Sequence, residues 1–158
     1  SQAYPLRRRQ IGLVPQIDLG STYNIHPTNK KEIGARCAKV ANLLHEQRPL
    51  SFGGARVEVV ERLDSALLIR FKEVGLGLQS SLPEQLPGFA VAGEDGKFHW
   101  AEARVIAGDS IHLKSLQVSV PRYVRYAWAD NPGPLDLFDG LGLPVPPFRT
   151  DKLQVPWE

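Results

Sequence analysis

The sequence predicts a composite fold, α/β in its first part and antiparallel β in the rest. An apolar run at residues 11–14 leads into a polar loop, and a helix-like stretch begins near residue 31. From Ser51 onward the helical pattern gives way to short runs rich in β-branched and aromatic residues, separated by turn residues, which is typical of a β-sandwich. We therefore expect two regions: residues 1–48 with a strand, a loop and a helix, and residues 49–158 with mainly β structure and a Pro/Gly-rich tail that packs back on the first region.

The composition is that of a soluble globular protein. Hydrophobic residues make up 42% of the 158 residues and charged residues 23%, which is enough for a domain with a real core. The net charge of +2 gives no reason to expect a nucleic-acid partner. Because Cys37 is the single cysteine, no internal disulfide or cysteine-based metal site can form. We expect no metal site and no cofactor in this chain. No apolar run approaches the length of a membrane span.

The helix is predicted over residues 31–46. Its apolar residues recur at helical spacing on one stripe, formed by Ile33, Cys37, Val40 and Leu44. Thr28 can cap the helix, Asn29 and Lys30 also form a capping-type sequence, and Pro49 prevents continuation. Since Cys37 falls on the apolar stripe, we expect a buried structural thiol rather than a nucleophile.

The strands are predicted from short β-type runs at residues 56–61, 66–71, 89–92, 98–106, 110–113, 116–120 and 122–128. Residues 95–96, an Asp-Gly pair, predict a hairpin because glycine tolerates positive φ, and residues 108–109 predict a second tight turn. Residues 75–88 are interpreted as a loop. Residues 131–147 are expected to form an extended segment packed through the apolar anchors Phe138, Leu141, Leu143 and Phe148.

His26 is the candidate for chemistry in the first region. It lies between Ile25 and Pro27, on the polar loop that follows the predicted strand. Loops at the carboxyl ends of strands commonly hold the active sites of α/β folds. Histidine titrates near neutral pH, so a histidine on such a loop can act as a general base. On spacing alone, a histidine that merely caps or lines the loop is the more common case.

Several short motifs occur together and in a fixed order. They are Asp18-Leu19-Gly20, Ile25-His26-Pro27, Asn29-Lys30, the Gly34-Ala35-Arg36 step in the helix, Val124-Arg125-Tyr126-Ala127-Trp128, Gly142-Leu143-Pro144 and Pro147-Phe148-Arg149-Thr150-Asp151. In this combination the chain resembles the C-terminal portion of the sialate O-acetylesterase family, carbohydrate esterases of the SGNH (GDSL-like) hydrolase group. The resemblance implies that residues 1–48 supply the last strand, the histidine loop and the final helix of an α/β/α hydrolase domain.

The resemblance also implies a function. The chain would be the C-terminal part of a serine-type carbohydrate acetylesterase, with His26 as the catalytic base. The nucleophilic serine would come from an N-terminal portion of the same enzyme, as an upstream segment or a separate chain, which is therefore the expected partner. The substrate would be an acetylated glycan, either an O-acetylated sialic acid or a plant polysaccharide such as xyloglucan or xylan. The protein would be periplasmic or secreted.

The group that orients His26 is left open by the sequence. Many SGNH hydrolases place an aspartate three residues before the histidine, where this chain has Tyr23. Bacterial members of the resembling family often have aspartates at the positions of Ser21 and Asn24. A backbone carbonyl, the amide of Asn24 or the carboxylate of Asp18 remain as orienting groups. A Ser-His dyad with a carbonyl is the preferred arrangement, and Asp18 can instead fix the loop.

Ser110 is a second candidate, because Gly108-Asp109-Ser110 resembles the start of the SGNH nucleophile block. That serine should open a helix and precede the histidine block. Ser110 instead follows the histidine block and leads into Ile111-His112-Leu113, which alternates like a strand. We therefore reject Ser110 as the nucleophile.

Two other functions stay open: a non-catalytic carbohydrate-binding or accessory β-sandwich module, and an inactive member of the resembling family. Arg125 and Trp128 lie on a run of alternating faces, where an aromatic side chain can stack on a sugar or pack in the core. Arg149 can form a buried ion pair or reach a binding cleft.

Overall fold

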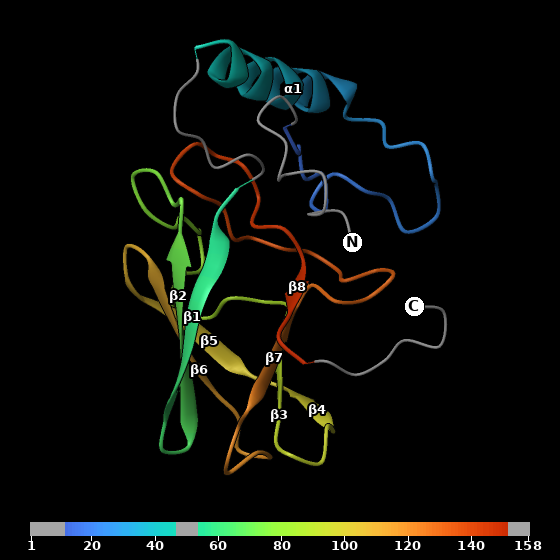
Figure 1. Ribbon diagram of the computed structural model, residues 1–158. Helices are drawn as coiled ribbons and strands as arrows, with labels where there is room; N and C mark the ends of the chain where they lie inside the picture. Colours follow the sequence, from blue (N-terminus) through green and yellow to red (C-terminus); the bar gives the residue numbers. More distant parts are fainter. Residues whose placement is uncertain (1–11, 47–53, 152–158) are drawn as a thin grey trace.

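The computed structural model describes residues 12–46 and 54–151, as one helix followed by eight strands (Figure 1). Helix α1 spans Lys30–His45 and lies at one end of a β body. The strands are β1 Arg56–Leu63, β2 Ala66–Lys72, β3 Phe89–Ala92, β4 Phe98–Trp100, β5 Glu102–Ala107, β6 Ser110–Lys114, β7 Tyr123–Tyr126 and β8 Phe148–Arg149.

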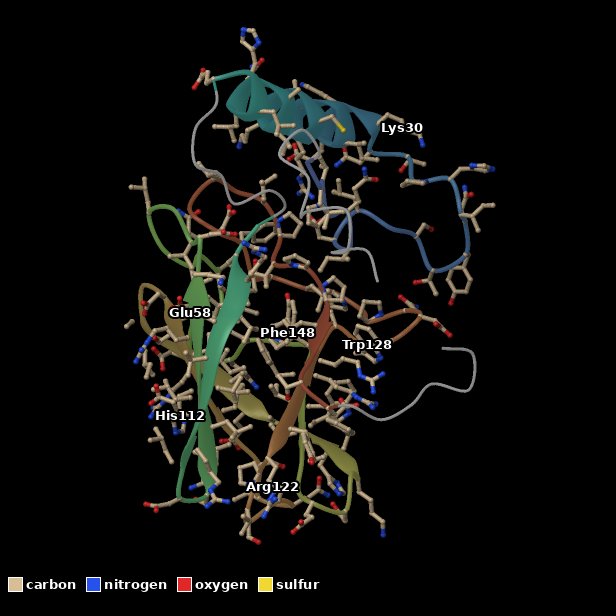
Figure 2. All side chains as sticks on the ribbon, viewed as in Figure 1. Lys30, Glu58, His112, Arg122, Trp128 and Phe148 are labelled. Atoms are coloured by element: carbon tan, nitrogen blue, oxygen red, sulfur yellow. The ribbon has the colours of Figure 1, made fainter. Side chains whose placement is uncertain are left out.

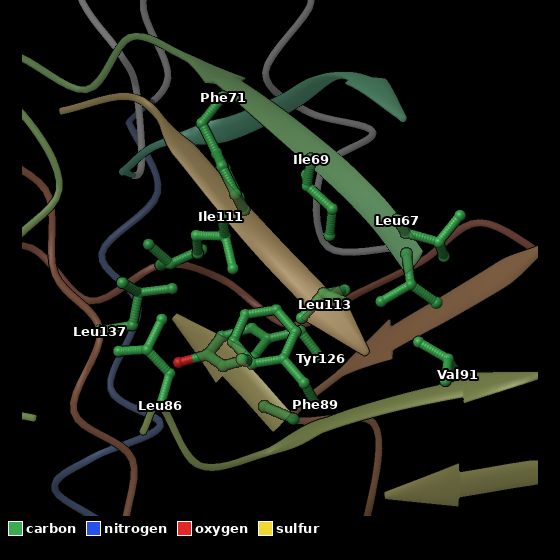
Figure 3. Close-up of a cluster of buried hydrophobic side chains, with 14 of the residues drawn as sticks. Leu67, Ile69, Phe71, Leu86, Phe89, Val91, Ile111, Leu113, Tyr126 and Leu137 are labelled. Carbon is green, nitrogen blue, oxygen red and sulfur yellow. The ribbon is translucent and has the colours of Figure 1, made fainter. Parts of the chain in front are cut away.

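The strands form two four-stranded antiparallel sheets. The first has the order β1-β2-β6-β5 and the second β4-β3-β7-β8. Alternate side chains of each sheet point to the shared interior, as the two-residue period of a strand requires. Figure 3 shows Tyr126 in the hydrophobic core cluster beside Phe89, and the centroids of the two rings are 4.6 Å apart. The predicted β-sandwich-like region is therefore confirmed.

Most of the predicted strands and turns are confirmed. Antiparallel pairing of β3 with β4 places residues 95–96 in the expected hairpin, where Gly96 has a φ of 68°. Residues 108–109 connect β5 to β6. Among the predicted anchors of the tail, Leu143 is fully buried, and further buried positions are Leu135, Leu137 and Val145.

Two of the predicted strand runs are wrong at the points where the chain passes from one sheet to the other. The run 98–106 is divided at Ala101, since β4 belongs to the second sheet and β5 to the first. Residues 116–120 form turns instead of a strand: the N–H of Val118 donates to the carbonyl of Ser115 at 3.3 Å, and Leu116 is exposed. Local alternation does not show which runs have a neighbouring strand to pair with.

The first region differs more from its prediction. Residues 12–16 are not a strand, because no described segment pairs with them. They lie against α1 instead: a Cβ added to Gly12 would come within 2.4 Å of Val40. The structure therefore does not show the predicted SGNH sheet, and that part of the fold stays a prediction.

Helix α1 is confirmed within one residue at each end, with Asn29 rather than Thr28 as its cap. The side chain of Asn29 accepts a hydrogen bond from the N–H of Glu32 at 3.2 Å. The expectation of a buried Cys37 is wrong, because Cys37 is exposed. The buried residues of the helix are Val40, which belongs to the predicted apolar stripe, and Arg36, which forms the ion pair described below.

Candidate functional site

The loop that carries His26 is held by its own asparagines. The N–H of His26 donates to the side-chain oxygen of Asn24 at 2.9 Å, and the N–H of Asn24 donates to the carbonyl of Ser21 at 3.4 Å. Asn29 closes the loop at its other end by capping α1. Together with the hydrogen bond from the N–H of Leu19 to the carbonyl of Gln16, these contacts form a short series of turns between residues 16 and 29.

An ion pair ties the start of this loop to α1. The guanidinium of Arg36 binds both carboxylate oxygens of Asp18, at 2.7 and 2.6 Å, and its Nε donates to Glu32 at 3.1 Å. The side chains of Arg36 and Asp18 are only 6% and 11% exposed. Hydrogen bonding to Asp18 raises the pKa of Arg36, against the opposing effect of burial. The Asp18–Arg36 pair thus joins the Asp18-Leu19-Gly20 motif before His26 to the Gly34-Ala35-Arg36 motif in α1.

His26 itself is exposed, as are its neighbours Tyr23 and Ile25, at 98% and 90%. No hydrogen bond or ion pair joins its imidazole to any residue in the described ranges. The amide oxygen of Asn24 is used by the backbone of His26, and the carboxylate of Asp18 is used by Arg36. The predicted roles of Asn24 and Asp18 as orienting groups therefore stay predictions.

Ser110 and His112, the other polar residues that the sequence singles out, both lie on strand β6. Ser110 begins β6, is buried, and donates its hydroxyl to Asp109 at 2.6 Å. His112 lies on the same strand opposite Arg104 of β5; partial burial lowers its pKa, and the charges of Arg104 and Lys114 act in the same direction. In residues 12–46 and 54–151, no three His, Cys, Asp or Glu side chains gather as a metal ion would require. Within these ranges α1 is too short and polar to span a membrane.

The two C-terminal motifs meet as neighbouring strands. β7 carries Arg125 and β8 carries Arg149, directly opposite each other in the antiparallel register. Between them lies Asp151, whose side chain is 1% exposed and binds Arg125 through Nε at 2.9 Å and Nη2 at 3.1 Å, and also binds Arg149. Burial alone would raise the pKa of Asp151, but the hydrogen bonds from both arginines hold it below its usual value.

The histidine loop and the β body are in direct contact. The side chain of Asn131, just beyond β7, donates to the hydroxyl of Thr22 at 3.2 Å. The ammonium of Lys39 in α1 donates to the carbonyl of Leu141 in the tail. In Figure 2 Trp128 lies on the side of the molecule toward which the loop before α1 projects. The sequence predicts that the tail packs back on the first region, but it does not show which residues make these contacts.

The chain thus consists of one helix followed by a β-sandwich-like body, with an exposed histidine loop at one end. The chain is similar to a carbohydrate acetylesterase from Xanthomonas citri, known from its crystal structure, with 34% sequence identity and a TM-score of 0.76. The alignment covers 85% of this chain and 31% of that enzyme's chain. No family model matches the sequence, and the comparison with curated proteins found no match. The chain is therefore related in structure to a carbohydrate acetylesterase and spans less than a third of that enzyme's length.

Proposed function

We propose that the chain is the C-terminal part of a carbohydrate O-acetylesterase of the sialate O-acetylesterase type, in which His26 is the general base. The observation that carries the proposal is the 34% identity to a carbohydrate acetylesterase over 85% of the chain. The geometry supports it, because an exposed imidazole stands on a loop fixed at both ends, by the Asp18–Arg36 pair and by the Asn29 cap. A fixed and open loop of this kind can accept a reacting group from a neighbouring segment.

In the proposed reaction the nucleophile is a serine of the upstream portion of the enzyme. His26 takes the proton of the serine hydroxyl as the oxygen attacks the acetyl carbonyl. The protonated imidazole then gives this proton to the departing sugar oxygen, which leaves an acetyl-serine. His26 next takes a proton from water, whose oxygen attacks the acetyl-serine, and returns it to the serine as acetate leaves.

Asp18 and Asn24 act on the position of the loop in this proposal. Both oxygens of Asp18 are bound to Arg36, so we assign Asp18 the task of fixing the loop to α1. Asn24 fixes the backbone at His26 through its amide oxygen. The preferred orienting group for the imidazole is a backbone carbonyl. From the same resemblance we propose a periplasmic or secreted location, which cell fractionation would test.

The first experiment compares His26→Ala with His45→Ala in the polypeptide that includes the upstream segment. Both positions are exposed histidines, and His45 lies at the far end of α1, so it is a matched control. Acetate release from acetylated xyloglucan and from p-nitrophenyl acetate should fall by about 10²–10⁴ in the His26 variant, the usual contribution of a general base. The control should keep its rate, and both variants should keep the circular dichroism of the parent.

A His26→Ala variant that releases acetate at the parent rate would refute the proposal. The accessory carbohydrate-binding module would then be the better function. Intact mass and N-terminal sequencing of the active material would show whether the serine comes from the same polypeptide or from a second chain.

A further inference from the structure

The second sheet carries a groove on its outer face, the side that points away from the core. Phe89 and Val91 of β3 point into the core, whereas Ala90 between them points outward. Ala90 lies opposite Trp100 of β4 on one side and Arg125 of β7 on the other. A small residue between two large ones leaves a hollow, and an open groove of about 410 Å³ lies there, with walls that include Gly88, Ala90, Phe98, Trp100, Arg125 and Trp128.

The two tryptophan side chains of this groove are exposed rather than buried. Trp100 is 74% exposed and Trp128 is 43% exposed. Large exposed aromatic residues that share one concave surface are uncommon on a protein that has no ligand for them. Tyr126, only two residues before Trp128, is by contrast completely buried. The chain therefore reverses the direction of its side chains between these two positions.

The reversal is built from two residues in the left-handed region. Ala127 has a φ of 50° and Gly88 a φ of +86°, and the N–H of Ala127 donates to the carbonyl of Gly88 at 2.9 Å. A left-handed alanine costs roughly 1 kcal/mol or more and is retained mostly where a side chain must be aimed. Here it aims Trp128 into the groove, and the guanidinium of Arg149 lies over the indole at 5.4 Å.

Arg125 supplies a polar group in the centre of the groove. Its guanidinium lies 3.9 Å from the ring centroid of Phe98, and its Nε and Nη2 are used by Asp151. The remaining nitrogen, Nη1, makes no hydrogen bond to any residue in the described ranges. The side chain is 25% exposed. The groove thus combines aromatic walls with a donor that is fixed by a buried carboxylate, Asp151, which also binds Arg149.

We propose that this groove is a subsite for a neutral glycan, in which a pyranose ring packs against Trp128 and Trp100 while Nη1 of Arg125 donates to a sugar hydroxyl. The C–H face of a sugar ring suits an aromatic wall, and its hydroxyls need donors and acceptors beside that wall. A neutral sugar is favoured over an acidic one, because Nε and Nη2 of Arg125 are used by Asp151 and leave no pair of nitrogens for bidentate binding of a sugar carboxylate.

The position of the groove relates it to the histidine loop. The segment that follows Trp128 forms part of the groove wall through Ala129 and Pro132, and Asn131, which immediately precedes Pro132, donates to Thr22 of the loop. A glycan in the groove would therefore extend alongside the loop that carries His26. The proposal deepens the proposed esterase function and rests on it for the choice of glycan, but not for the existence of the subsite.

Binding is tested without turnover. The probe is deacetylated xyloglucan, cast into a native gel, and the protein is the full polypeptide with His26→Ala, so that failure of catalysis does not affect the readout. Trp128→Ala and Trp100→Ala should each weaken retardation by about tenfold in apparent Kd, the loss of about 1.4 kcal/mol. Trp128→Phe should retain most of the binding because it keeps an aromatic face. Leu76→Ala is the matched control, a 94% exposed apolar residue outside the groove.

Three results would overturn the subsite. The first is that the gel retards the parent and all three tryptophan variants, Trp100→Ala, Trp128→Ala and Trp128→Phe, equally. Another is stronger binding of a sialylated oligosaccharide than of xyloglucan. The third is a parent that is not retarded, while Trp100→Ala and Trp128→Phe lower its melting temperature far more than Leu76→Ala does; the upstream portion of the protein would then cover the groove. Loss of binding in the tryptophan variants would support the subsite, and it would do so even if the parent polypeptide with His26 intact released no acetate, a result that would refute the proposed function alone.

Discussion

Replacing Asp18 by Asn tests whether this carboxylate fixes the histidine loop or acts on His26 directly. The variant keeps the shape of the side chain and one acceptor oxygen but removes the charge that balances Arg36. Arg36 is 6% exposed, so its charge would remain buried with Glu32 as the nearest acid. If the Asp18–Arg36 pair is a tether, the loop and the first turns of α1 should open more often.

The size of the effect follows from the burial of the pair. Removing one partner of a buried ion pair costs about 3–5 kcal/mol, because the other charge stays uncompensated. The remaining bond to Glu32, whose side chain is 46% exposed, offsets part of this cost, about 0.5 kcal/mol for a helical pair of this spacing. We expect about 3 kcal/mol, which is a rise of about 150-fold in local opening.

Amide hydrogen exchange across α1 measures the opening, and acetate release by the full polypeptide measures its consequence. Arg36→Met removes the opposite charge and keeps a long apolar side chain, so the double variant has no buried charge left. For a tether, each single variant loses protection and activity together, and the double variant loses less than the sum of the two. An Asp18→Asn variant that loses activity with normal protection, beside an active Arg36→Met, would show that Asp18 serves His26 and that the tether is wrong.

Three further predictions concern the β body. The pKa of Asp151 is lowered in the fold, so its stabilising effect is present above its unfolded pKa of about 3.9 and is lost as pH falls through the folded value. Asp151→Asn should therefore lower Tm most near pH 7. A loss of Tm that grew toward pH 3 would contradict this. Burial raises the pKa of Asp139, whose Oδ2 has no hydrogen-bond partner in the described ranges, so Asp139→Asn should raise Tm at pH 8 and have little effect at pH 3.5, as a melting series would show. Gly88→Ala should destabilise by about 1–3 kcal/mol in urea unfolding, because the new Cβ would meet Leu135 at 2.6 Å and φ is +86°. The matched Gly34→Ala, where nothing lies within 4 Å, should not destabilise the chain.

The sequence predicts those parts of the fold that local chemistry decides. Residues 89–92 form the strand that their apolar run predicts, and the Asp-Gly pair at 95–96 lies in the turn of the hairpin that it predicts. Asn29 caps α1 through a bond to a residue three positions away. In each of these cases the interacting groups are neighbours in the chain, so the pattern contains the answer.

Features that need a distant partner were missed or misjudged. Residues 12–14 have the composition of a strand but no strand beside them, and residues 116–120 connect two sheets instead of joining one. Cys37 is exposed although it lies on the predicted apolar stripe, whereas the neighbouring Arg36 is buried and paired with Asp18. At the candidate site, the sequence indicated His26, Asp18 and Arg149 as single residues, but it did not show that Asp18 pairs with Arg36 or that Asp151 joins both arginines.

The shared carboxylate of Asp151 also determines how the last strand is aligned. β8 has two residues, too few for backbone hydrogen bonds alone to select one register against its neighbour β7. Its pairing places two arginines face to face, which would repel each other without the acid between them. A slip of one residue would separate that charge cluster and turn Phe148 away from the ring of Phe71, whose centroid is 5.8 Å away. The alignment of β8 is therefore encoded twice, by charge on one face of the sheet and by aromatic packing on the other, so a change in either should disturb both.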